Sequence, residues 1–128
     1  MRELEELFAS LAKSAFRKKF HLHGKDLEYL HNKGLSTVLS HANDFITKRL
    51  APAFPEKDGK QTPFRGHPVF VAQHATACCC RGCLEKWHRI PKGYPLGVDE
   101  ETYIINVLKY WFLEELQRHE ADLNANQK

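Results

Sequence analysis

The sequence predicts a mainly α protein, with about five helices in one small domain, a long Pro/Gly-rich loop and at most a short strand pair. Several segments repeat apolar residues at intervals of three and four, which is the period of a helix with one buried face. Four prolines and two glycines gather in residues 51–68 and indicate the loop. A chain of 128 residues, 42% of them apolar, is long enough to bury one core, so we expect residues 1–128 to form a single domain.

Three helices are predicted before the loop. Residues 2–19 carry one apolar stripe, and a short helix is expected over 25–32, with Gly34 placed for a left-handed C-terminal cap. Residues 35–50 have the clearest stripe in this half of the chain. The two stripes comprise Leu4, Leu7, Phe8, Leu11, Ala15 and Phe16, and then Leu35, Val38, Leu39, Ala42, Phe45, Ile46 and Leu50.

The second half predicts a less regular arrangement. Residues 69–71 fit a buried helix entry better than an edge strand, and residues 72–87 form either one helix or two short helices that meet near Gly82. The last helix is expected to start at an N-cap, Asp99, and to end near Glu120, leaving a frayed tail over 121–128. Its stripe comprises Ile104, Ile105, Leu108, Trp111, Phe112 and Leu116.

Composition and charge narrow the function classes. No apolar run suits a signal peptide or a membrane span, so we expect a cytoplasmic protein in which clustered cysteines are metal ligands or reactive thiols. The net charge is +3, but residues 48–93 alone hold nine basic and three acidic side chains. This excess predicts a basic face for nucleic acid or another anionic partner, or simply a solvated surface. The expected anion-binding residues are Lys60, Arg65, Arg81 and Arg89.

All four cysteines and three histidines fall within residues 67–88. Cys80 and Cys83 form a C-x2-C step, which lets two thiolates hold one ion from a tight turn. His88, on a helix predicted to start near Leu84, could reach back as the third ligand. Zinc prefers four thiolate or imidazole ligands, so we expect a zinc site with His74 as the fourth ligand and His67 or Cys79 as alternates.

Other interpretations of this stretch remain open. The cysteines are small enough to be ordinary core residues of a metal-free helical interaction module. Alternatively, Cys79 or Cys80 is a nucleophile whose pKa is lowered by a nearby cation. A zinc ion with an open coordination position would make the protein a metal-dependent hydrolase or nuclease. The candidate catalytic residues for such an enzyme are Asp58, Arg65, His67 and His74.

Long motifs carry a resemblance to a known family. The segments DGKQTP, RGHPVFVAQHATA and CRGCLEKWH resemble a family of small bacterial proteins classed as a domain of unknown function, over about residues 16–115. That family usually has threonine at position 78, so the resemblance implies that Cys78 is not an essential ligand and that Cys79, Cys80 and Cys83 are the family thiols. It implies one functional unit from Asp58 to His88 and no particular reaction.

Overall fold

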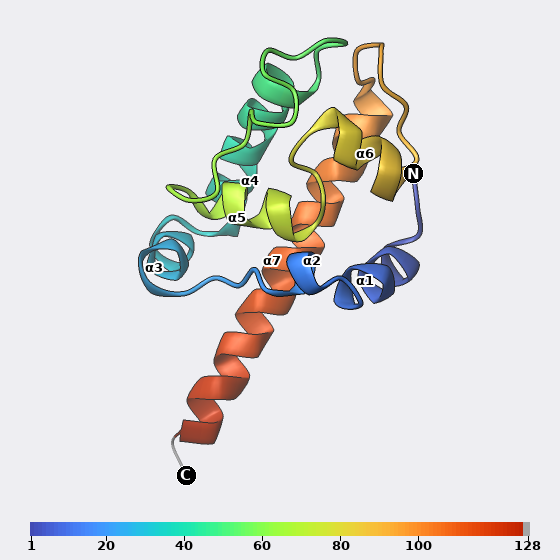
Figure 1. Cartoon of the computed structure of the whole chain (residues 1–128). Coiled ribbons are helices and arrows are strands. Elements are labelled where there is room, and N and C mark those ends of the chain that lie inside the picture. The colour runs from blue at the N-terminus through green and yellow to red at the C-terminus, as the bar shows by residue number, and fades with distance from the viewer. Residues whose placement is uncertain (127–128) are drawn as a thin grey trace.

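The computed structural model, which describes residues 1–126, is built around one long C-terminal helix (Figure 1). The mainly α class is confirmed: residues 1–126 contain seven α-helices, one π-helical turn and no strand. The expected helix over residues 2–19 is divided in two, and residues 67–88 form two short helices rather than one, which accounts for the difference from about five. None of the described helices is long and apolar enough to cross a membrane.

The first expected helix is interrupted, and this interruption sets the direction of one arginine. Helix α1 spans Leu4–Ala12, and α2 spans Ala15–Lys18. Between them, the Ser14 hydroxyl accepts a hydrogen bond from the backbone N–H of Arg17 at 3.1 Å, as an N-cap does. The new helical start changes which side chains face inward, and Arg17 is 9% exposed.

Two helices follow in the middle of the chain, and the second of them packs against the long C-terminal helix. Helix α3 covers Gly24–Lys33, and Gly34 follows it with φ of 85°, a value that favours glycine. Helix α4 covers Leu35–Phe45 and continues as the π-helical turn η1, Ile46–Leu50, where the N–H of Ala51 bonds the carbonyl of Ile46 at 2.8 Å. The expected helix over 35–50 is therefore continuous in direction, but its last turn is wider.

Residues 67–88 form two short helices, one of the two arrangements expected from sequence. Helix α5, Pro68–Ala75, is buried along its whole length, and α6 covers Arg81–His88. The five residues between them include Ala77, whose φ of 59° turns the chain sharply. This turn brings the cysteines back toward α2.

Helix α7, Val98–Asn126, starts one residue before the expected N-cap and continues past Glu120. The expected frayed tail is therefore helical as far as residue 126, and its last two residues lie outside the described part of the chain. The other helices gather around the first part of α7, while its C-terminal end projects from the body (Figure 1). The core contributed by α7 comprises Ile104, Val107, Leu108, Trp111 and Phe112.

Candidate metal centre

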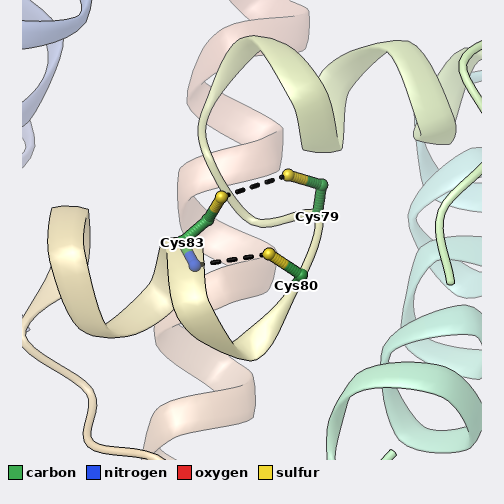
Figure 2. A group of neighbouring side chains, drawn as sticks. All are labelled: Cys79, Cys80 and Cys83. Atoms are coloured by element: carbon green, nitrogen blue, oxygen red, sulfur yellow. Dashed lines mark hydrogen bonds between the residues drawn. The ribbon is translucent and has the colours of Figure 1, made fainter. Parts of the chain in front are cut away.

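Three cysteine sulfurs converge where the α5–α6 connection enters α6. The Sγ atoms of Cys79, Cys80 and Cys83 all lie within 4.8 Å of one another, and those of Cys79 and Cys83 are 3.6 Å apart (Figure 2). Cys80 is the N-cap of α6, and its sulfur accepts a hydrogen bond from the N–H of Cys83 at 3.4 Å. Thiolates are good metal ligands, so this group could hold a metal ion.

A buried guanidinium lies against these sulfurs. Arg17 approaches the sulfur of Cys83 to 3.2 Å and that of Cys79 to 3.7 Å, and it donates to the carbonyl of His74 at 2.8 Å. Its guanidinium carbon also lies 5.8 Å from the ring centroid of Trp87. Among the described residues, no carboxylate is within ion-pair distance of Arg17. The thiols are therefore the side chains that can supply the negative charge a buried cation requires.

The two sulfurs of the close pair have different acidities. The pKa of Cys83 is lowered because its sulfur accepts hydrogen bonds from the thiols of Cys79 and Cys80, with a further contribution from Arg17. The pKa of Cys79 is raised by its hydrogen bonds to Cys80 and Cys83 and by burial. Without a metal, Cys83 is therefore the more acidic thiol of the close pair, and Cys79 donates a hydrogen bond to its sulfur.

His88, the expected third ligand, does not lie with these sulfurs. Helix α6 runs without a break from Arg81, and each residue turns the helix by about 100°, so His88 points away from Cys83 by about 140°. Its Nε2 donates to the carbonyl of Thr76 at 2.8 Å, and its Nδ1 accepts from the Tyr103 hydroxyl at 2.7 Å. His88 is 0% exposed and acts as a core residue, 3.4 Å from the sulfur of Cys78.

This burial predicts acid sensitivity. Burial lowers the pKa of His88 to about 4, whereas an unfolded histidine titrates near 6.5. As pH falls below about 6.5, the unfolded chain binds a proton at His88 that the folded protein does not. The free energy of unfolding therefore decreases, by up to roughly 3 kcal/mol by about pH 4. We expect the urea midpoint, measured with a chelator present, to fall over this range. In His88→Gln the urea midpoint should be lower at neutral pH and less dependent on pH. If the midpoint of this variant fell with pH as steeply as that of the original protein, His88 would not be the source of the acid sensitivity.

The other two expected histidine ligands are also outside the three-sulfur group, and each makes other hydrogen bonds. His74 is 7% exposed, its Nε2 donates to the carbonyl of Thr62 at 3.0 Å, and its ring stacks on Phe64 with centroids 4.1 Å apart. His67 precedes α5, whereas the thiols follow it, so about 12 Å of helix separates them. The Nδ1 of His67 accepts from the N–H of Val69, and its Nε2 lies 3.2 Å from Nδ1 of His41.

Arg81, an expected anion-binding residue, instead joins two loops in the interior. It is 1% exposed, and its guanidinium donates to the carbonyl of Pro52 at 2.8 Å and to those of Pro91 and Tyr94 at 3.1 and 2.9 Å. Asp58, a catalytic candidate, accepts from the N–H of Arg81 at 3.1 Å and so caps α6. Lys60, Arg65 and Arg89 are exposed.

Sequence reasoning missed Arg17, the side chain that completes this centre. The apolar stripe over residues 2–19 places it on the outer face of one continuous helix. The signal that could have identified it is Ser14, three residues before Arg17, because serine is a strong N-cap and a weak helix former.

Together, the fold and the site define a small helical protein with a three-thiol centre backed by a buried guanidinium. The chain belongs to the family described as domain of unknown function DUF4186, whose model matches residues 5–113. This match confirms the resemblance to a domain of unknown function. No solved structure matches the chain.

Proposed function

We propose that this protein binds zinc through Cys79, Cys80 and Cys83. The observation that carries this proposal is the convergence of three sulfurs beside a buried cation that has no carboxylate partner among residues 1–126. Thiolates bound to one tetrahedral zinc, each at about 2.3 Å, are about 3.8 Å apart. The 3.6 Å between the sulfurs of Cys79 and Cys83 is close to this sulfur–sulfur distance.

Charge also supports a divalent ion. Three thiolates and Zn²⁺ together carry one negative charge, and the guanidinium of Arg17 at 3.2 Å from Cys83 balances it. The N-terminus of α6 adds partial positive charge beside the sulfur of Cys80, its N-cap residue. A neutral overall site is cheaper to bury than a charged one.

Three protein ligands leave one tetrahedral position for a water or an exogenous ligand. Within the described part of the chain, the group of candidate ligands contains only these three residues. Sites of this kind suit catalysis or exchange of a ligand, whereas structural zinc sites are closed by four protein ligands. The proposed zinc centre is therefore compatible with a metal-dependent hydrolase, although no histidine or carboxylate base lies in the group.

One observation favours a second candidate, thiol chemistry without a metal. The sulfurs of Cys79 and Cys83 are 3.6 Å apart, and a small movement would bring them to the roughly 2.05 Å of a disulfide. A guanidinium that stabilises the Cys83 thiolate would also prepare it for attack on an oxidant or another disulfide.

Metal analysis separates the two candidates. We expect about one zinc per chain in protein purified without a histidine tag, and three thiols that react with an alkylating reagent only after chelation. Cys80→Ser should lose the zinc. Cys78→Ser makes the same chemical change at a buried cysteine outside the group and should keep it. No metal, together with rapid alkylation of one thiol and formation of a Cys79–Cys83 disulfide on mild oxidation, would instead support thiol chemistry.

A further inference from the structure

A basic hollow lies between the π-helical turn and the long loop, on residues that the metal centre does not use. It encloses about 460 Å³ and is lined by four cationic side chains and a single carboxylate, that of Glu56. All four cations are exposed, and none is within ion-pair distance of a described carboxylate. These cations are Lys48, Arg49, Lys57 and Lys60. Such an excess attracts phosphate groups.

An exposed aromatic ring stands at the same hollow. Phe54 is 83% exposed, although burial of a phenylalanine ring would stabilise the fold by about 2 kcal/mol. The neighbouring cation Arg49 is oriented by rings, because its guanidinium carbon lies 5.0 Å from the centroid of Phe45 and 5.4 Å from that of Phe70. A group of cations beside a free aromatic ring is typical of surfaces that bind single-stranded nucleic acid.

The loop that presents these groups is held at three points. Arg81 bonds the carbonyl of Pro52, Asp58 caps α6, and the Thr62 hydroxyl donates to the carbonyl of Cys79 at 2.7 Å. Phe54, Lys57 and Lys60 lie between these anchors, so a ligand would not have to order a free loop when it binds. Preorganisation of this kind reduces the entropic cost of association.

The backbone of Lys57 forms a tight turn in this loop. Its φ is 54°, in the left-handed region, where a side chain with a Cβ costs about 1 kcal/mol and glycine costs little. The carbonyl of this residue accepts a bond from the N–H of Lys60 at 2.8 Å, which closes the turn. This turn lies at the hollow, and the Lys57 side chain is one of those that line it.

We propose that this hollow binds single-stranded nucleic acid, with phosphates on Lys48, Lys57 and Lys60 and an unpaired base stacked on Phe54. A single strand is required because the base faces of a duplex are covered by neighbouring bases, whereas a free ring needs an exposed base face. None of the residues that line the hollow belongs to the three-thiol group, so the contacts to the strand do not use the zinc proposed above.

Fluorescence anisotropy with a labelled single-stranded oligonucleotide and the matched duplex tests this. We expect tighter binding to the single strand, and affinity that falls as salt rises. Phe54→Ala, at an exposed position, should weaken binding about tenfold without altering the melting temperature. Lys57→Gly should weaken binding and reduce the slope of log affinity against log salt by about 0.7, while leaving the fold intact. Lys13→Gly, at an exposed lysine that does not line the hollow, is the control.

The result is decisive in either direction. No binding at low salt would overturn the proposal, as would equal binding of single strand and duplex with no effect of Phe54→Ala. Equal affinity for polyglutamate would show a general polyanion surface, and that would also overturn it. Repeating the titration after chelation separates the two sites, because no residue that lines the hollow is a proposed zinc ligand and the preference for a single strand should therefore remain.

Discussion

Replacing Arg81 with glutamine is expected to lower the free energy of unfolding by at least about 3 kcal/mol. The guanidinium is 1% exposed and its two terminal nitrogens reach the carbonyls of Pro52, Pro91 and Tyr94. Hydrogen bonds from a charged donor are each worth about 1.5–3 kcal/mol, and buried carbonyls left without a donor add a further penalty. A glutamine is too short to reach both loops, so the loops before and after the thiol segment should loosen together.

Urea unfolding of Arg81→Gln and of a matched variant measures this effect. Arg89→Gln makes the same change at a side chain that is 70% exposed and 3.8 Å from Glu6, and it should cost less than about 0.5 kcal/mol. Hydrogen exchange should show faster opening of the loop amides in Arg81→Gln alone. A decrease in the free energy of unfolding of less than about 1 kcal/mol would contradict the structural role of Arg81.

The helices could be predicted because their apolar residues recur with the period of an α-helix. The positions at which the helices are interrupted could not be predicted in this way. The stripe over residues 35–50 continues in phase through η1, since a π-helical turn keeps Ile46 and Leu50 buried. The break at Ser14 is not visible in the stripe, because it depends on one side-chain cap. The extension of α7 beyond Glu120 was not predicted either, since its last residues are polar and mainly exposed.

The candidate site was predicted as a stretch of sequence rather than as a set of ligands. Adjacent cysteines and a C-x2-C step must lie close together in space, so the sequence alone predicts that Cys79, Cys80 and Cys83 are neighbours. The position of His88 depends instead on where α6 begins. A start at Arg81 gives a rotation that carries the imidazole into the core, and spacing alone does not contain that information.

Contacts between residues far apart in the chain explain why the positions of Arg17 and Arg81 were not predicted. Arg17 reaches Cys83 across 66 positions in the chain, and Arg81 reaches Pro52 across 29. Charge patterning identifies both as cations, but it cannot distinguish a buried guanidinium from a solvated one. Their different surroundings suit different roles: Arg81 bonds neutral carbonyls, whereas Arg17 bonds sulfurs that can ionise.

Replacing Arg17 with glutamine is therefore expected to weaken zinc binding by about 10–100-fold, the usual effect of removing a partner that orients and neutralises metal ligands. The variant leaves the net negative charge of a zinc–thiolate group without its balancing cation. Without metal, the onset of Cys83 alkylation should move to higher pH, because Arg17 helps to hold the pKa of this thiol below its ordinary value. Arg17→Lys keeps the charge but cannot reach all three acceptors, so its affinity should be intermediate.

Competition with a chelator measures the zinc affinity, and alkylation rates at several pH values measure the acidity of the thiol. Lys18→Gln is the matched control: it removes one positive charge from the next residue, which is exposed and makes no bond to the sulfurs. If Lys18→Gln weakened zinc binding as much as Arg17→Gln, general charge would explain the effect. If Arg17→Gln lowered stability but changed neither zinc affinity nor the alkylation profile, the guanidinium would be a packing group and the thiol centre would work without it. A large effect in Arg17→Gln alone would mean that α2 supplies the fourth functional group of a centre whose other three come from one short stretch of chain.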